Sequence, residues 1–500
     1  MIVDMEDELS ANEPYAKPLQ RRYVFYYGVG HMLNDITSAC WFTYLLLFLT
    51  EIGLTPRDAA IVMLSGQFAD GIATIVAGEL IDRFGHFKLW HAGGSVLVAI
   101  SFSSVFGGCL PCKILGTNSS SAQTIGYSVF AAIFNVGWAA TQVSHMEKHA
   151  NGGLQSPKQT FDGDKPKSDV VLWDSFLLMK SSVFNGLSMV NCITRNPSSR
   201  VALASCRNAF TMVANLSLYA IALAVFNIFS ARTTSDIENQ YLWIACLSIF
   251  LGCCFVVIFL AGIKEPRLQQ QSEHKCRQRI SWTHWFKKTL YYQVALVYLL
   301  MRLVTNVSQT LLAFYVINDL QMAQYAKALV PAVIYICSFV ASVALQEIKW
   351  TGKRLKIIFT VGAILWVFSG AGILFLPSEL HGFMYLLSII IGVANALMTV
   401  TGISMESVLV GEDLNGCAFV YGSLSFLDKI SCGIALYVLE SYQDTAPSLH
   451  GCNVFGGCIS VSRYGLALVP GSCAILGAIV AYTMDLPTST SEPLLEPLLV

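Results

Sequence analysis

A few charged side chains stand inside long apolar runs of this sequence. Asp35 and Asp70 fall in the first two runs, Arg302 in a run of the second half, and Asp428 and Lys429 side by side in a later one. An ionised group in hydrocarbon is costly, so each such residue faces a partner or a polar cavity. Acids opposite bases around one cavity could hold a zwitterion or bind H⁺ or Na⁺. The alternative is a buried ion pair that only joins two helices.

Further polar side chains follow these charges at helical spacing. Asn306 and Gln309 come one and two turns after Arg302, which places all three on one helix face. The run around Asn135 repeats the pattern, and Arg207 could either reach the same cavity or extend to the membrane surface. The sequence predicts a substrate site lined by Asp35, Asn135, Trp138, Gln142, Arg207, Arg302, Asn306, Gln309 and Lys429.

Other kinds of chemistry find no support in the sequence. There is no Ser-His-Asp ordering, no HExxH helix, no phosphate-binding glycine loop and no zinc-type spacing of cysteine and histidine. We therefore expect no enzyme, no bound metal and no cofactor. The net charge is −1 and no domain concentrates basic residues enough to attract nucleic acid, so we expect no nucleic-acid partner.

The elements that carry these residues are expected to be membrane-spanning helices. Of 500 residues, 54% are hydrophobic and 13% are charged, which is too apolar for a soluble protein. A helix needs about 20 apolar residues to cross a bilayer. We predict an all-α membrane protein in which the lipid bilayer surrounds twelve spans, at about 24–48, 59–81, 91–109, 125–145, 201–230, 241–263, 290–316, 327–346, 357–376, 382–404, 416–438 and 464–484.

Polar segments divide these spans into two groups of six. The basic stretch 264–289 is predicted to link an amino-terminal bundle, 24–263, to a carboxy-terminal bundle, 290–484, with tails at 1–23 and 485–500. A second polar segment, 146–199, interrupts the first bundle. Its latter half could be a thirteenth span, but Asp174 and Lys180 near its middle make insertion costly. We therefore assign it to a cytosolic insert.

Basic residues predict the orientation in the membrane. Lys and Arg gather on one side of alternating spans, which places both termini in the cytosol. The sequon at Asn118 then falls on the lumenal side, where a glycan could be attached. Two cysteine pairs also fall there, and they could form disulfides or stay reduced: Cys109 with Cys112, and Cys452 with Cys458.

The sharpest local motif is GELIDRFGHFK between the second and third spans. Gly78 and Gly85 allow helix ends to approach closely, while Asp82, Arg83 and Lys88 can form a charge network that breaks when the halves move. The pattern matches the G-x-x-x-D-R-x-G-x-x-K/R loop of the major facilitator superfamily. We predict a cytosolic gating motif; an ordinary turn is the alternative.

Longer stretches resemble one branch of that superfamily. The runs YGVGHMLNDI, GQFADG and DRFGHFKLWHAGG are similar to the glycoside-pentoside-hexuronide cation symporters, the melibiose-permease branch. The runs GWAATQVSH, AFTMVANLSLY, RLVTNVSQT and CAFVYGSLSFLDK narrow the resemblance to lysosomal and melanosomal cysteine transporters of animals. It implies the major facilitator fold with two pseudo-symmetric halves, import of cysteine into lysosomes or melanosomes, and a role in pigmentation.

The resemblance also implies roles for single residues. Asp35 matches the sugar-binding acid of the first helix, Asp70 the first cation-site acid, Arg207 the base of the fifth helix, and Lys429 the lysine of the eleventh. The second cation-site acid, four residues after Asp70, is replaced here by Thr74. This departure disfavours a sodium site of the melibiose type and favours proton coupling or facilitated transport.

Two other functions stay open at this stage. One is a cation-coupled sugar or lysolipid symporter, and the other is a non-transporting membrane scaffold whose buried charges pair off. The tail SEPLLEPLL adds acidic residues and two Leu pairs, which suggest binding of sorting adaptors.

Overall fold

The computed structural model describes residues 21–84, 86–117, 119–147, 197–262, 283–345, 348, 350–410, 417–445 and 460–486. Several predicted features lie outside these residues: most of the insert, most of the linker, most of both tails, Asn118, Gly85, Cys452 and Cys458. The side chains of Asp82 and Arg83 lie outside them as well. The division into tails, insert and linker therefore stays a prediction.

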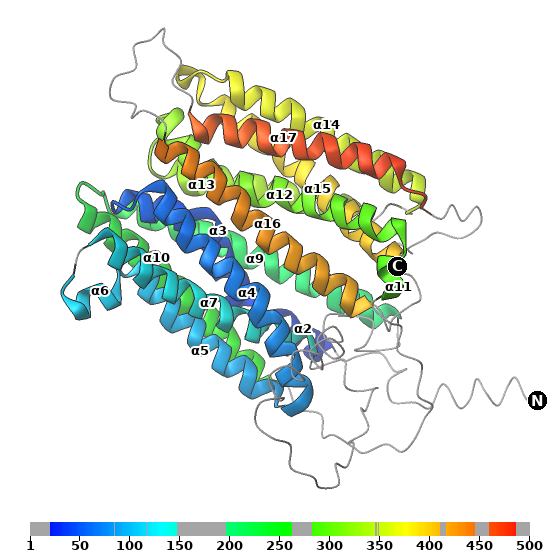
Figure 1. The fold of residues 1–500 in the computed structure, drawn as a ribbon, viewed down its shortest axis with the longest axis horizontal. Helices are drawn as coiled ribbons and strands as arrows, with labels where there is room; N and C mark the ends of the chain where they lie inside the picture. Colours follow the sequence, from blue (N-terminus) through cyan, green and yellow to red (C-terminus); the bar gives the residue numbers. More distant parts are fainter. Residues whose placement is uncertain are drawn as a thin grey trace, which may run out of the picture.

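The described chain is helical throughout and forms two halves (Figure 1). The amino-terminal half contains α2 (Arg21–Val29), α3 (Met32–Glu51), α4 (Pro56–Phe84), α5 (Phe87–Phe106), the short α6 (Leu110–Leu115), α7 (Ser120–Glu147), α9 (Pro197–Ile228) and α10 (Thr234–Gly262). The carboxy-terminal half contains the short α11 (Thr283–Phe286), α12 (Thr289–Phe314) with a π-helical turn (Tyr315–Asp319), α13 (Ala326–Leu345), α14 (Gly352–Phe375), a 3-10 turn (Ser378–Leu380), α15 (Phe383–Val410), α16 (Cys417–Thr445) and α17 (Val461–Thr483).

Eleven helical spans of the described chain are long and apolar enough to cross a membrane, with α2 and α3 counted together. The remaining long helix, α7, carries Asn135, Trp138 and Gln142 within its apolar sequence and packs against α4 and α5. With α7 the two halves hold six long helices each. The predicted twelve-helix all-α membrane fold is confirmed.

The two halves meet along three pairs of helices. α4 packs against α16, α3 against α12, and α9 against α13 (Figure 1). We call the end of the bundle with α6 and the last residue of α3 the Glu51 end, and the opposite end, with α11 and the last residue of α10, the Gly262 end (Figure 1). These pairings set which side chains can meet at the centre.

The first predicted span is broken, which corrects the expected single helix. α2 ends at Val29, Gly30 donates its backbone N–H to Tyr27 in a turn, and α3 begins at Met32 with His31 before it. Glycine weakens a helix because it loses more backbone freedom on folding than other residues do. The break places His31 and the first turn of α3 at the side of α9.

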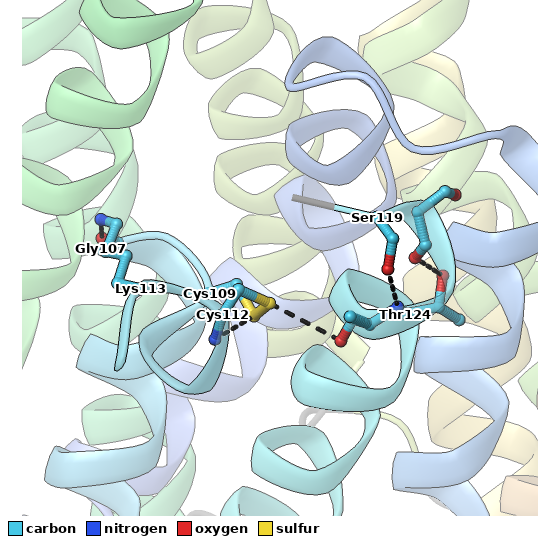
Figure 2. The surroundings of a disulfide bond; sticks show 8 residues. Gly107, Cys109, Cys112, Lys113, Ser119 and Thr124 are labelled. Atoms are coloured by element: carbon cyan, nitrogen blue, oxygen red, sulfur yellow. Dashed lines mark hydrogen bonds between the residues drawn. A yellow bond between two sulfur atoms is a disulfide. The ribbon is translucent and has the colours of Figure 1, made fainter. Parts of the chain in front are cut away.

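Close contacts and one disulfide shape the amino-terminal half. A Cβ atom built on Gly94 of α5 would lie 2.7 Å from the carbonyl oxygen of Gly137 on α7, so the two helices touch through backbone. Between these helices, at the Glu51 end, Cys109 and Cys112 form a disulfide (Figure 2). Lys113 donates to the carbonyl of Gly107 in the same turn (Figure 2). Of the two states left open for this cysteine pair, the structure has the oxidised one.

Candidate substrate and ion site

An ion pair joins the two halves near the middle of their helices. The ammonium of Lys429 on α16 lies 2.5 Å from the carboxylate of Asp70 on α4. The hydroxyl of Thr74 donates to Asp70 at 3.3 Å and lies 3.4 Å from the Lys429 nitrogen. Trp138 of α7 places its ring 5.0 Å from the same nitrogen, within reach of a cation–π contact. These four residues, all predicted for the site, form one cluster.

Small residues allow α4 and α16 to approach closely enough for this pair. A Cβ on Gly71 of α4 would meet the ring of Phe426 on α16 at 2.9 Å, and one on Gly433 of α16 would meet Leu64 of α4 at 2.8 Å. Asp70 is 2% exposed as a result. Such enclosure strengthens the attraction between the charges, and it makes loss of either partner costly.

A second ion pair lies within the carboxy-terminal half. The Nε of Arg302 on α12 donates to Asp428 of α16 at 2.9 Å, and Asn306 donates to the other oxygen of the same carboxylate at 3.2 Å. The Arg302 side chain keeps 34% of its surface accessible. Asp428 precedes Lys429 in the chain, so α16 carries adjacent charges that serve both ion pairs. Arg302 is the most accessible member of these two ion pairs.

A third ion pair lies within the amino-terminal half. Arg207 of α9 lies 3.8 Å from Asp35 of α3, which also accepts a hydrogen bond from the hydroxyl of Thr211 at 2.8 Å. Arg207 further contacts the imidazole of His31 at 3.2 Å. Asp35 therefore pairs with a base of its own half, and so does Arg302 with an acid of its own half. Of the predicted acids and bases of the site, Asp70 and Lys429 are the pair that joins the two halves.

Gln309, a predicted site residue, also links the halves. Its amide nitrogen donates to Thr43 at 3.0 Å and to the carbonyl of Ala39 at 3.4 Å, both on α3. Its amide oxygen accepts from the hydroxyl of Tyr335 on α13 at 3.1 Å. Tyr335 in turn packs against Tyr219 of α9 across the interface. The contacts of Gln309 hold α3 and α12 together on the Glu51 side of the central pair.

A fourth ion pair was not predicted from the sequence. Lys327, the second residue of α13, is 1% exposed and lies 3.2 Å from the carboxylate of Glu51, the last residue of α3. Its ammonium also donates to the hydroxyl of Tyr241 and lies 4.6 Å from the ring of Phe226. Both residues stand at the borders of their apolar runs, so hydropathy alone placed them at the membrane surface.

The polar residues of α7 pack mainly against neighbouring helices. The Trp138 nitrogen donates to the backbone of Asn34 on α3 at 3.3 Å, and the Asn34 amide donates back to the Trp138 carbonyl at 3.2 Å. Asn135 is buried against Gly66 of α4. Gln142 is half-buried one turn from Trp138. Trp138 thus reaches the charged cluster, while Asn135 fills the α4–α7 contact.

The predicted gating motif is described only in part. Gly78 is buried on α4, and Lys88 is half-buried in the first turn of α5. Because the side chains of Asp82 and Arg83 lie outside the described residues, their charge network stays a prediction. Within the described residues no group of His, Cys, Asp and Glu is placed to hold a metal ion.

Comparisons with known proteins decide the family. A family model described as MFS/sugar transport protein matches residues 176–488. The chain belongs to this family. MFS/sugar transport proteins carry solutes, so the chain is a membrane transporter and not an enzyme, which agrees with the absence of a catalytic arrangement in its sequence.

Curated relatives support this membership over nearly the whole length. The chain is 28% identical over 498 residues to human major facilitator superfamily domain-containing protein 12, with 93% of each chain covered. It is 29% identical over 501 residues to the mouse protein of the same name, with 95% of this chain and 94% of the relative covered. These matches confirm the resemblance to this protein, while cysteine as the substrate and the lysosome or melanosome as the location stay predictions.

Solved transporters share the fold. A D-xylose-proton symporter superposes with a TM-score of 0.63 at 12% identity, covering 94% of this chain and 99% of that one. The xylose transporter XylE from E. coli, in its inward open conformation, gives 0.61 at 13% identity, covering 94% and 97%. The nucleoside transporter NupG gives 0.58 at 12% identity, covering 92% and 99%. At these identities the likeness establishes the major facilitator fold.

Proposed function

We propose that this MFS transporter is an alternating-access carrier that moves cysteine, or a similarly small zwitterion, into lysosomes or lysosome-related organelles such as melanosomes. The observation that carries the proposal is the pair of adjacent charges on α16: Lys429 bonds Asp70 of the opposite half, and Asp428 bonds the partly accessible Arg302. A solute bound here would touch both halves at once.

Paired charges of this kind suit a zwitterion. An amino acid brings a carboxylate, which can bind Arg302 or Lys429, and an ammonium, which can bind Asp70 or Asp35. Removing one partner from a buried ion pair leaves an uncompensated charge. A zwitterion avoids this cost because it replaces both partners while the site keeps its net charge. An uncharged sugar would leave the existing pairs intact.

The contacts between the halves support alternating access. Several polar contacts between the halves lie at the centre or on the Glu51 side of it: the central pair, Gln309 with Thr43, and Lys327 with Glu51. These contacts would hold a carrier closed at the Glu51 end. Breaking the contacts at this end would open the site to the other side.

Cysteine and the organelle come from the sequence resemblance described above. In this proposal the Glu51 end faces the lumen, both termini lie in the cytosol, and the Leu pairs of the tail bind sorting adaptors. Asp70 and Thr74 form the coupling-ion site. Because Thr74 bonds Asp70 and no second carboxylate is within the described cluster, H⁺ suits this site better than Na⁺.

Uptake of labelled cysteine by proteoliposomes or isolated lysosomes tests the proposal. We expect Asp35→Asn and Lys429→Ala to lower initial uptake by about tenfold or more, because each leaves a buried charge without its partner. Matched controls are Asp485→Asn and Lys353→Ala, which change exposed groups of the same types and should transport normally.

Three outcomes would contradict the proposal. Undiminished uptake by both site variants at equal protein level would place the site elsewhere. Competition by sugars or lysolipids, rather than by amino acids, would favour a symporter for those solutes. Absence of solute flux with any class of substrate would favour a membrane scaffold.

A further inference from the structure

Four acids of the described helices are buried, namely Asp70, Glu406, Asp428 and Glu440, and two of them lie beside no base. Asp35, Glu51, Asp70, Asp319 and Asp428 each lie within 4 Å of an arginine or lysine nitrogen. Glu406 and Glu440, which are 3% and 1% exposed, form no such pair. An isolated carboxylate away from water is very unfavourable, so these two groups need another form of neutralisation.

Glu440 is the more isolated of the two. Glu406 of α15 is attracted electrostatically by the guanidinium of Arg302. Both carboxyl oxygens of Glu440 are buried and lack a hydrogen-bond partner among the described residues, and no charged group acts on them. If the Glu440 carboxyl holds a proton it is neutral, and the cost of burying a charge is avoided.

Helix geometry places Glu440 at the interface between the halves. Phe426, Lys429 and Gly433 of α16 all contact α4. Glu440 lies about three turns beyond Lys429, which returns it to the same face of the helix. Tyr437, one turn before it, is hydrogen-bonded to Arg57 in the first turn of α4. Glu440 is therefore enclosed where α4 and α16 meet at the Glu51 end.

The charged groups around this position have other partners. Arg57 is exposed and bonds Tyr437, and the neighbouring Asp58 accepts from the hydroxyl of Ser120. On α17, the other helix that packs against α16 at this end, Arg463 lies 3.6 Å from Asp319 at the end of the π-helical turn of α12. None of these bases compensates Glu440 in the closed arrangement.

We propose that Glu440 is a proton-binding site that couples closure of the Glu51 end to uptake of one proton. In the closed arrangement the carboxyl is protonated and dry. When α4 and α16 separate at this end, water and Arg57 reach the group and it ionises. The proposal rests on the alternating-access function, and it adds Glu440 as a second proton-binding residue, separate from the coupling-ion site at Asp70 and Thr74.

The sign of the pH effect follows from the binding of the proton. The closed state holds one more proton than the open state, so acidification on the Glu51 side favours closure and a rise in pH favours opening. A single proton changes the open-to-closed ratio by at most about tenfold per pH unit. If this end faces an acidic lumen, protonation closes the carrier after the solute has left.

Hydrogen–deuterium exchange of the purified full-length protein tests this coupling. We expect exchange in the first turns of α4 and the last turns of α16, corrected for the intrinsic rate, to rise from mildly acidic to neutral pH. Glu440→Gln keeps the size of the side chain but cannot ionise, so it should stay protected at both pH values. Glu440→Met provides a second variant that cannot titrate, and Glu440→Asp should retain the pH response.

Glu379→Gln is the matched control, since it removes an exposed carboxyl of the same half at the same end. It should behave as the unmodified protein. A pH response unchanged in both Glu440→Gln and Glu440→Met, or lost equally in Glu379→Gln, would overturn the proposal. The readout needs no transported solute, so its failure is distinguishable from failure of the cysteine uptake assay.

Discussion

The pair of Lys327 and Glu51 offers the sharpest test of how the carrier is held closed. Lys327 begins α13 in one half and Glu51 ends α3 in the other, and the lysine nitrogen is enclosed by Tyr241 and Phe226. Lys327→Met keeps the side-chain length and removes the charge. Glu51→Gln removes the opposite charge with no change in size. Both variants should favour separation of the halves at the Glu51 end.

The size of the effect can be worked from the distance. At 3.2 Å and an effective dielectric constant of about 20, the two charges attract by about 5 kcal/mol. Desolvation opposes this attraction, and Glu51 keeps 19% of its side chain exposed, which weakens it further. We expect a net coupling of about 2 kcal/mol, which is roughly a thirtyfold change in the ratio of closed to open carriers.

A double-mutant cycle measures this coupling directly. Hydrogen–deuterium exchange at the start of α13 gives the opening ratio for Lys327→Met, Glu51→Gln and the double variant. Because each single change already breaks the pair, the double variant should open less than the sum of the singles predicts. Lys113→Met, an exposed lysine at the same end, is the control and should leave exchange unchanged. Strict additivity, or no opening in either single variant, would refute the reasoning.

Two further predictions concern stability. Gly94→Ala should lower the free energy of unfolding by about 1–3 kcal/mol, because the new Cβ would meet the backbone of Gly137. Gly93→Ala is the control and should be neutral or stabilising, because a Cβ there meets nothing within 4 Å. Equal melting temperatures for the two variants would contradict this. Removal of the disulfide by Cys109→Ser with Cys112→Ser should lower the free energy of unfolding by about 2 kcal/mol, because the disulfide no longer restricts a short loop in the unfolded chain. The loss is measured as a lower unfolding midpoint. Reductant should lower the midpoint of the unmodified protein by most of the same amount.

The sequence predicted the fold because hydrocarbon imposes a simple rule on it. Each crossing must be a long apolar helix, so the apolar runs of the sequence mark the helices. The ends are less exact, since α10 begins at Thr234, ahead of the run predicted from 241, and α16 continues to Thr445, past the predicted 438. The broken first span is an exception. Gly28 and Gly30 inside this run carry too weak a signal for a break, because a glycine costs a helix only about 1 kcal/mol.

The site was predicted less completely, and the reason is again physical. Charges in the middle of apolar runs, such as Asp70 and Lys429, are recognisable because they must be neutralised there. Glu51, Lys327 and Glu440 stand where apolar runs stop, and a hydropathy pattern places such residues at the membrane surface. They are buried because neighbouring helices extend past them, which only the tertiary arrangement reveals.

The polar character of α7 has a consequence for how the protein is made. This helix holds Asn135, Thr141 and Gln142 within an apolar sequence that has no acidic or basic residue from 121 to 144, and it packs at the heart of the amino-terminal half between α4 and α5. Each of these polar side chains lowers the free energy that the helix gains by entering lipid alone. We expect α4 and α5, which pack against α7, to assist its integration, so substitutions at their contacts with α7 should impair this stage of biogenesis.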